Sequence, residues 1–584
     1  MGDVFKSCES TEDIEITSCQ QESILNQSGE ENVSTTINSI KKTWISYIRT
    51  HCKTMAMMYL LHIFVASYVG LAIHFWNENG RCTIDWCNGL GMLIIILSFI
   101  YGGLIYYQII KKYFGQFLYQ NIIHPVHLWW KNQLKQRHVR FAAYSLPAGV
   151  ALIFLIFDTE GHSERLKSTL GMTVILLLGF IFSRYPGKIK WQPVMWGLGI
   201  QFLLGLLIIR WSVGRFIFQC IGEKAATFLR YGNEGARFVY GHQLIDNGVF
   251  AFQALAVIFF LSFIVQILYY FGAMQWLVLK LGWVLQISMG TTVCESVHAA
   301  ASIFLGMSES TLLFKPYIKD LTKSELHAIM TEGFATVAGS VLAAYISFNI
   351  EPAHLITASV MSAPAALCYS KLFYPETEQS KNRVNNMVLE QSNDNSVLDA
   401  ATRGALSAIE LVLGIIATIV AFVSFTAFLN GVISWLGVLV GLDDLSFEYV
   451  LSRIFIPLAW LMGVEWEQCG EVAELIGLKT VVNEFVAYQQ LGKLKIAGKL
   501  SPRSEMIATY ALCGFSNPGA LGILVGVLAT VAPMQRSAVT EIALRAWIAG
   551  SATCFLTACI AGMLTTEENL LQTISTSTNI SAVQ

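Results

Sequence analysis

Long apolar blocks alternate with short polar loops along most of the chain. Two of these blocks cover 89–110 and 249–272, and they read "GLGMLIIILSFIYGGLIYYQII" and "VFAFQALAVIFFLSFIVQILYYFG". Each is longer than the about 20 helical residues that cross the hydrocarbon core of a bilayer. Four further spans are predicted at about 55–76, 141–157, 169–183 and 194–210. The pattern therefore predicts an all-α polytopic membrane protein.

The composition agrees with a protein that lies in a bilayer. Hydrophobic residues make up 54% and charged residues 13% of the 584 residues, whereas a soluble domain has about 25% charged residues. The formal net charge is −2 and the sequence has no basic face. Because nucleic acids bind to basic surfaces, the charge indicates no nucleic-acid partner.

The positions of Lys and Arg predict the orientation of the first span. Lys41, Lys42, Arg49 and Lys53 precede this span, whereas the loop that follows it holds only Arg81. Cytoplasmic loops carry an excess of these two residue types. The N-terminus is therefore predicted to lie in the cytoplasm.

Polar segments divide the chain into regions. Residues 1–54 are predicted to form a disordered tail, without an early apolar stretch that would indicate a cleaved signal peptide. Residues 211–241 mix apolar and charged residues at helical spacing, which predicts a helix along the membrane interface. The other predicted regions are extra N-terminal spans (55–168), the first half of a core (169–374), a polar linker (375–400), the second half of the core (401–563) and a C-terminal tail (564–584).

The cysteines give no indication of a metal site. The twelve cysteines form no CxxC pair and no cluster with histidines at metal-ligand spacing. Cys82 and Cys87 share a short polar loop, where the sequence is compatible with a disulfide or with two free thiols. Most others, such as Cys294 and Cys513, lie in apolar segments and are interpreted as packing residues. The sequon at Asn579 is either a glycosylation site, if the tail lies outside the cell, or a chance tripeptide.

Two segments in the second half of the chain resemble each other. Residues 324–339 read "SELHAIMTEGFATVAG" and residues 504–520 read "SEMIATYALCGFSNPGA". Both begin with Ser-Glu and reach Gly-Phe followed by small or polar residues, which unwind a helix inside a membrane. Upstream of each lies a segment too short and polar to span well, at 294–314 and at 461–488. The sequence thus predicts a re-entrant hairpin followed by a broken helix, twice, as in secondary transporters with a midplane binding site.

Each predicted hairpin carries a carboxylate, Glu309 in the first and Glu484 in the second. Charges at membrane depth are costly and mostly functional, so both are candidate binding residues. The alternative is that they are structural carboxylates paired inside the bundle. Two further carboxylates, Glu295 and Glu465, fit either role. Three histidines are interpreted as packing residues rather than proton carriers, namely His298, His327 and His354.

An ordered series of motifs resembles the concentrative nucleoside transporter family over residues from about 170 to 563. The motifs are "ESV" (295–297), "GMSESTLL" (306–313), "KSELHAIMTEGFATVAGSVLAAYISF" (323–348), "SVMSAPAALCYSKLFYPETE" (359–378), "GVEWE" (463–467), "NEFVAY" (483–488), "RSEMIATYALCGF" (503–515) and "ACIAG" (558–562). The resemblance implies a secondary active symporter that imports nucleosides such as uridine and adenosine across the plasma membrane, driven by the sodium gradient through alternating access. It implies no enzymatic activity and no cofactor besides sodium as the coupling ion.

The resemblance also implies an architecture. The family has about eleven spans in its animal type, with two inverted repeats of re-entrant hairpin plus broken helix. It implies a homotrimer in the lipid bilayer, in which the transport domain of each protomer moves against a scaffold.

The family's site residues fall on defined positions of this chain. The residues implied to surround the substrate are Met307, Ser308, Glu309, Glu484, Phe515, Asn517 and Ala520. The residues implied to hold sodium are Ser302, Leu305, Thr336 and Val337, of which Leu305 and Val337 act through backbone oxygens. Ser308 and Glu309 face the nucleobase in this scheme, and Glu484 and Asn517 bind the ribose hydroxyls. A carboxylate accepts charge-assisted hydrogen bonds from vicinal hydroxyls, and sodium prefers the oxygens that an unwound helix frees.

Three of these positions depart from the family's pattern. Met307 stands where the family has a glutamine, and it cannot hydrogen bond to the edge of a base. Ser302 replaces an asparagine that binds sodium, and Ala520 replaces a serine that helps to hold ribose. Pro518, directly after Asn517, has no N–H. The site has therefore lost polar groups, which leaves three alternatives. The substrate range has shifted, the coupling ion has changed from sodium toward protons, or transport is poor.

Two other classes of function were weighed against a symporter. An intramembrane enzyme with Glu309 or a histidine as its base is disfavoured, because the sequence has neither an HExxH pair nor a GxSxG elbow. A transporter-shaped protein that only binds nucleosides is the second alternative. The retained carboxylates argue against it, and the three departures argue for it.

Overall fold

The computed structural model describes residues 31–78, 86–118, 163–381, 394–442 and 445–566, with isolated positions between these ranges. Every regular element within them is a helix, which confirms the predicted all-α class. The chain divides into two compact units, Met1–Ile122 and Ile123–Gln584.

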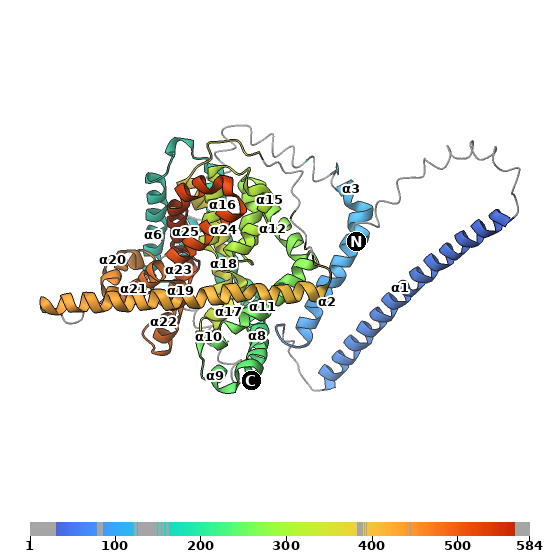
Figure 1. The fold of residues 1–584 in the computed structure, drawn as a ribbon, viewed down its shortest axis with the longest axis horizontal. Helices are drawn as coiled ribbons and strands as arrows, with labels where there is room; N and C mark the ends of the chain where they lie inside the picture. Colours follow the sequence, from blue (N-terminus) through green and yellow to red (C-terminus); the bar gives the residue numbers. More distant parts are fainter. Residues whose placement is uncertain are drawn as a thin grey trace. The chain divides into compact units, whose positions relative to one another are not determined.

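The first unit contains two long helices. Helix α1 (Glu31–Glu78) and helix α2 (Leu90–Ile105) are joined by a hydrogen bond of 2.9 Å between His62 Nδ1 and Tyr101 Oη. A π-helical turn (Tyr106–Phe114) and α3 (Gly115–Leu118) extend α2. Helix α1, at the blue end of the colour scale in Figure 1, begins at Glu31 and so reaches into the segment that was predicted as a disordered tail.

Eight helices of the described residues are long and apolar enough to cross a membrane. They are Met55–Glu78, Leu90–Phe117, Trp191–Arg210, Phe250–Tyr270, Lys323–Ser347, Pro352–Phe373, Val397–Leu439 and Pro533–Leu564. The first four coincide with predicted spans, so the chain is a multi-pass membrane protein. The predicted span at 169–183 is helix α6 (Ser163–Ile181), and the one at 141–157 lies outside the continuously described residues. The total of about eleven spans stays a prediction.

The second unit begins with helices that precede the two predicted repeats. They are α6 (Ser163–Ile181), α7 (Trp191–Gly205) with a π-helical end (Leu206–Arg210), α8 (Ser212–Tyr240), α9 (His242–Asp246) and α10 (Phe250–Gln253). Helix α8 corresponds to the predicted interfacial helix. Its buried residues recur about every three or four positions, from Gly222 through Ala226 and Leu229 to Ala236, and they form the narrow apolar face of an amphipathic helix.

Two series of helices then follow, and they share their order of elements except for the short helix α15, which occurs only in the first. The first series is α11 (Ala256–Tyr270), α12 (Ala273–Met289), α13 (Val293–Ser302), α14 (Met307–Leu312), α15 (Lys315–Ile318), α16 (Lys323–Ala335), α17 (Gly339–Ser347) and α18 (Pro352–Phe373). The second is α19 (Val397–Leu439), α20 (Phe447–Leu461), α21 (Cys469–Val481), α22 (Glu484–Ile496), α23 (Pro502–Leu512), α24 (Pro518–Val531) and α25 (Arg536–Leu564). Helix α19 starts within the last residues of the predicted linker and runs uninterrupted, as Figure 1 shows.

Each series contains a hairpin and a broken helix. We call α13 and α14 the first hairpin, α21 and α22 the second hairpin, residues 336–338 the first helix break and residues 513–517 the second helix break. Helix α14 packs against α24, and in the same manner α17 packs against α22. Each hairpin therefore contacts the second half of the broken helix that belongs to the other series.

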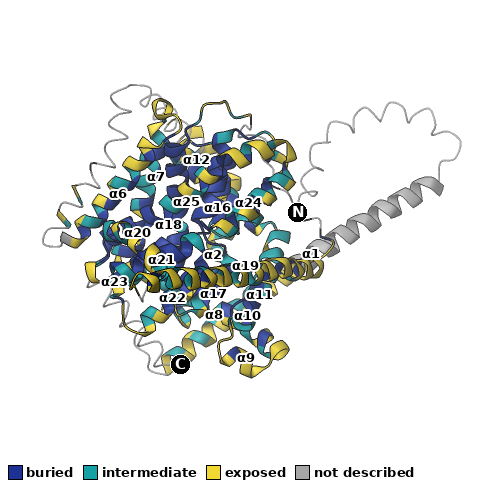
Figure 2. Ribbon diagram, turned by 60° about the vertical axis from the view of Figure 1, so that its left-hand side comes forward, coloured by how far each residue is buried: buried dark blue, intermediate teal, exposed yellow. Residues whose placement is uncertain are grey.

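The core of this unit lies along α16, α18 and α25. Figure 2 shows these helices largely as buried residues, whereas much of α19 is exposed. Helix α16 packs against both α18 and α25. Small residues permit the close approach: a Cβ added at Gly550 of α25 would lie 2.4 Å from the Cβ of Phe334 on α16. This rigid bundle holds the two helix breaks in place.

Candidate functional site

The second hairpin meets the second helix break through a buried pair. Asn517 Nδ2 donates to Glu484 Oε2 at 2.5 Å, and the two residues are 5% and 3% exposed. Asn517 is the N-cap of α24, because its Oδ1 accepts the backbone N–H of Ala520 at 2.8 Å. Pro518 lacks an N–H but suits the first position of a helix, where that group would have no partner inside the helix. One asparagine therefore starts α24 and holds the carboxylate of the second hairpin.

Four predicted substrate residues are brought together at this point. The N–H of Asn517 donates to the Phe515 carbonyl oxygen at 3.0 Å, so Phe515, Asn517 and Ala520 form one turn beside Glu484. Two nearby hydroxyl groups have no role predicted from the sequence. Those of Ser516 and Tyr345 are buried and have no hydrogen-bond partner among the described residues. Their hydrogen-bonding capacity is therefore not used by the protein within the part of the chain that the structure describes.

The first hairpin places three predicted residues at the start of α14. The carboxylate of Glu309 accepts the backbone N–H of Gly306 at 3.0 Å and so caps this short helix. Helix α14 packs against α24, which Asn517 caps. A Cβ added at Gly333 of α16 would lie 3.0 Å from the Cβ of Met307, so Met307 packs closely on α16. Ser308 follows Met307 on the same turn and is partly exposed.

The predicted sodium ligands lie where the first hairpin meets the first helix break. The Ser359 hydroxyl of α18 donates to the Ile303 carbonyl oxygen at 3.3 Å and lies 3.5 Å from that of Val337. The N–H of Gly339 donates to the Phe304 carbonyl oxygen at 3.1 Å. These bonds join the turn of the hairpin, which contains Leu305, to the break. Ser359 was not singled out by the sequence analysis, because nothing local distinguishes it from a packing serine.

The two side-chain ligands of the predicted sodium site have their donors engaged. The Thr336 hydroxyl donates to the Glu332 carbonyl oxygen at 2.8 Å, and the Ser302 hydroxyl donates to that of Ala299 at 3.0 Å. A hydroxyl has one donor and two acceptor lone pairs. Because the hydrogen of each hydroxyl is already used, both oxygens can only offer lone pairs to a further group such as a cation. Hydroxyl and carbonyl oxygens together are ligands that fit a hard monovalent cation.

The other ionisable residues considered in the sequence analysis have protein partners. Glu295 Oε2 lies 2.5 Å from Lys371 Nζ, and Glu465 accepts the Ser501 hydroxyl at 2.8 Å. Both carboxylates thus have structural partners. Lys371 is a lone lysine in an apolar segment, and its sequence position alone did not identify Glu295 as its partner.

The three histidines are likewise in packed surroundings. His327 Nδ1 lies 2.7 Å from the Ser370 hydroxyl, and the ring of His354 lies 6.1 Å from that of Tyr510, measured between centroids. His298 Nδ1 lies 2.5 Å from Glu332 Oε2. The partner of His298 was not predicted, although a carboxylate four residues before a helix break was a signal that the sequence contained.

Most cysteines of the second unit that the structure describes are packing residues, whereas Cys220 of α8 is disulfide-bonded. Cys294, Cys513, Cys554 and Cys559 are buried and are not disulfide-bonded. Cys87 is disulfide-bonded, which excludes a free thiol at this position. Its predicted partner Cys82 and the sequon at Asn579 lie outside the described residues.

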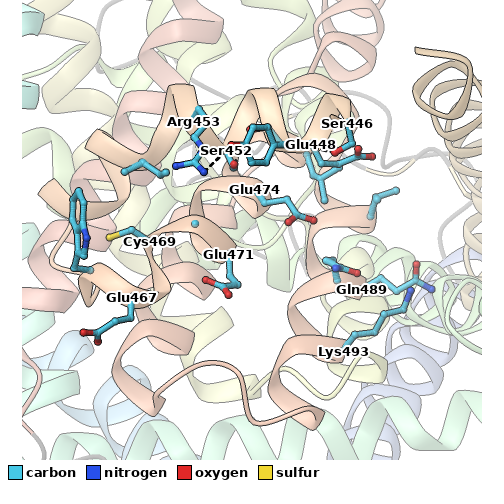
Figure 3. Close-up of a pocket in the computed structure, with 17 residues that line it drawn as sticks. Ser446, Glu448, Ser452, Arg453, Glu467, Cys469, Glu471, Glu474, Gln489 and Lys493 are labelled. Carbon is cyan, nitrogen blue, oxygen red and sulfur yellow. Dashed lines mark hydrogen bonds between the residues drawn. The ribbon is translucent and has the colours of Figure 1, made fainter. Parts of the chain in front are cut away.

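A separate cavity of about 810 Å³ opens between α20, α21 and α22. Figure 3 shows carboxylates of Glu448, Glu471 and Glu474 in this cavity, together with Gln489 and Lys493 of α22. None of the residues predicted to bind substrate or sodium lines it. It is therefore distinct from the site that the hairpins and the helix breaks form.

Three family descriptions match successive parts of the chain. Residues 170–243 match "Na+ dependent nucleoside transporter N-terminus", residues 251–349 match "Nucleoside recognition", and residues 354–562 match "Na+ dependent nucleoside transporter C-terminus". Together they include both hairpins and both helix breaks.

Characterised relatives match over most of the chain. Solute carrier family 28 member 3 of Mus musculus is 44% identical over 501 residues, which are 83% of this chain and 70% of the relative. Sodium/nucleoside cotransporter 1 of Rattus norvegicus is 42% identical over 492 residues, which are 81% of this chain and 74% of the relative.

Solved structures of CNTnw share the fold. The inward-facing substrate-bound state of CNTnw superposes with a TM-score of 0.65 at 37% identity, over 68% of this chain and 97% of that chain. A variant of CNTnw in an outward-facing state gives the same TM-score, identity and coverage. The chain belongs to the sodium-dependent nucleoside transporter family, which consists of membrane transporters and not of enzymes.

Proposed function

We propose that the protein is a secondary active symporter that imports nucleosides across the plasma membrane by alternating access, driven by the sodium gradient. The observation that carries this proposal is the buried pair of Glu484 and Asn517. A carboxylate at membrane depth is costly, and the carboxylates that are retained there are mostly functional. Here it lies between the second hairpin and the second helix break, on elements that belong to the family's core.

Glu484 is proposed to recognise the sugar. Ribose presents two neighbouring hydroxyl donors, and a carboxylate accepts both through charge-assisted hydrogen bonds. The amide of Asn517 fixes the orientation of the carboxylate by donating to Oε2. The unpartnered hydroxyl of Ser516 adds a polar group next to Asn517 in the chain.

Ser308 and Glu309 are proposed to face the nucleobase from the first hairpin. Met307 adds only apolar surface, and it packs closely on Gly333. Hydrogen-bonding capacity toward the base is therefore confined to the two residues that follow Met307. Binding is expected to select nucleosides by the shape of the base more than by its edge.

Sodium is proposed to bind between the first hairpin and the first helix break. Its ligands are the hydroxyl oxygens of Ser302 and Thr336 and the backbone oxygens of Leu305 and Val337. All are neutral, so the affinity for sodium is expected to be low. Coupling to protons through Glu309 is the alternative, and we favour sodium because the oxygens of the break are retained.

The assembly and placement of the protein are proposed from its family. We expect a homotrimer in which each protomer transports independently, with the N-terminus in the cytoplasm. Uridine, adenosine and related nucleosides are the expected substrates.

Uptake of radiolabelled uridine and adenosine in cells that lack endogenous nucleoside carriers tests the proposal. Uptake that requires sodium, and that falls when choline replaces it, is the expected result. Nucleoside binding to the purified protein without uptake would instead support a transport-deficient binding protein. The Glu484→Gln variant, checked for surface expression, is the control for transport through the proposed site.

A further inference from the structure

Lys479 of the second hairpin is a fully buried lysine. Its side chain is 0% exposed. It lies on α21 among apolar residues, where a lysine is unusual. Its Nζ donates to the Ala511 carbonyl oxygen at 2.8 Å and to that of Cys513 at 3.3 Å. The ammonium group also lies 5.8 Å from the centroid of the Phe555 ring of α25. The positive charge is thus held by two backbone oxygens and an aromatic face.

The two carbonyl oxygens belong to the end of α23 and to the second helix break. An interrupted helix leaves carbonyl groups without their intrahelical donors, and inside a membrane such groups need another partner. Lys479 supplies that partner from the hairpin. A lysine ammonium carries three donors and one positive charge, so one side chain satisfies more than one oxygen.

The first series of helices has a matching arrangement. Ser302 stands five residues before Met307, the first residue of α14, and Lys479 stands five residues before Glu484, the first residue of α22. Both positions therefore lie at the same distance from the tip of their hairpins. In the first series this is the place proposed for sodium, where the cation meets the carbonyl oxygens of the first helix break.

We propose that the ammonium group of Lys479 is the tethered cation of the second helix break, so that only the first break exchanges its cation with the solution. The inference rests on the proposed sodium site of the first break. A tethered cation stabilises the partial negative charge of the carbonyl oxygens at all times. It does not have to bind from solution. It also keeps the second break, which contains Asn517, in place whether or not sodium is bound.

The second helix break packs against the end of α16, close to the oxygens that Lys479 binds. Gly514 of the second break approaches α16 so closely that an added Cβ would lie 2.5 Å from the Phe334 carbonyl oxygen. The thiol of Cys554 donates to the Cys513 carbonyl oxygen at 2.5 Å. The oxygen that Lys479 binds is therefore part of the packed contact between the end of α16 and the second break. A shift of this oxygen would displace the second helix break. The break contains Asn517, which holds the carboxylate of Glu484.

The experiment removes the tethered cation and offers a free one. Lys479→Ala opens a space and removes the charge, Lys479→Met fills the space without the charge, and Lys493→Ala on the exposed face of α22 is the matched control. Thermal unfolding of the purified proteins is measured in choline chloride, with and without methylammonium. Uridine uptake is measured under the same conditions.

We expect Lys479→Ala to unfold at a lower temperature than the wild type and to be stabilised by methylammonium, whereas the wild type, Lys479→Met and Lys493→Ala do not respond. Uptake by Lys479→Met should fall about tenfold or more at equal surface expression, because the variant loses both hydrogen bonds of the ammonium group and one charge-assisted hydrogen bond alone accounts for about tenfold. Lys479→Ala that gains no more from methylammonium than the wild type overturns the proposal. If Lys479→Ala does not reach the membrane, uptake by Lys479→Met at the wild-type level overturns it instead.

The unfolding measurement does not depend on transport. A wild-type protein without sodium-dependent uptake would disprove the proposed function, whereas the response of Lys479→Ala to methylammonium would still decide whether the second break holds a tethered cation.

Discussion

His298 Nδ1 lies 2.5 Å from Glu332 Oε2, and both side chains are fully buried. The pair joins α13 of the first hairpin to α16, one helical turn before the first helix break. The backbone of Glu332 also accepts the hydroxyl of Thr336, and His298 lies one turn before Ser302. The pair therefore fixes the spacing of the two elements that contribute the proposed sodium ligands.

His298→Ala is expected to raise the sodium concentration needed for half-maximal uptake more than it raises the KM for uridine. Removal of the imidazole leaves a buried carboxylate without its partner, which costs about 1–3 kcal/mol of stability. The double variant His298→Ala/Glu332→Ala should lose less stability than the two single variants together, because no unpaired group remains. Equal changes in the sodium and uridine parameters would show that the pair is a general packing contact.

Glu484→Gln is expected to abolish uptake of every nucleoside while the protein still reaches the cell surface. The change keeps the shape of the side chain but removes the charge that accepts two hydroxyl donors, at about 1.5–3 kcal/mol per charged hydrogen bond. Uptake kinetics and surface biotinylation measure the two effects. An unchanged apparent affinity in this variant would refute the assignment of Glu484 to the sugar.

Met307→Gln is expected to sharpen the discrimination between nucleosides. A polar site rejects a base with the wrong edge more strongly than an apolar one does, because buried polar groups are left unpaired. Competition by a panel of purine and pyrimidine nucleosides measures the effect. If the order and spacing of inhibition constants are the same in both proteins, Met307 serves only to pack against Gly333.

Ser302→Asn is expected to lower the sodium concentration for half-maximal uptake. An amide carbonyl reaches one atom further than a hydroxyl and presents a stronger dipole to a cation. Uptake is measured against sodium concentration at about pH 5.5 and about pH 7.5, where a proton-coupled carrier would respond to pH. Uptake that ignores sodium and rises on acidification would contradict sodium coupling in favour of protons.

Gly514→Ala is expected to destabilise the protein and to reduce uptake. Gly514 has φ +111°, and a Cβ there would lie 2.5 Å from the Phe334 carbonyl oxygen. Strain at such a backbone position costs about 1–3 kcal/mol before the close contact is counted. Gly522→Ala in α24, where nothing lies within 4 Å of the added Cβ, is the matched control and should be neutral or slightly stabilising. A normal melting temperature for Gly514→Ala would show that the second helix break adjusts freely.

The sequence by itself determined the class of the protein and the local features of its site. Apolar length predicted membrane helices because a helix must span the bilayer with its backbone bonds satisfied internally. The hairpins were predicted from segments too short and polar to span a bilayer, and the helix breaks from Gly-Phe followed by small or polar residues. The structure added that Asn517 is the N-cap of α24, with Pro518 at the first position of the helix.

Only the tertiary structure decided which residues meet across these elements. The pairs of Glu295 with Lys371 and of His298 with Glu332, and the contact of Lys479 with Ala511, join residues on different helices. The sequence showed each of these charged residues, but it did not show which residue each of them contacts. A charge in an apolar segment must find a partner somewhere in the bundle, and the packing of the helices, rather than any local pattern, determines which partner lies within reach.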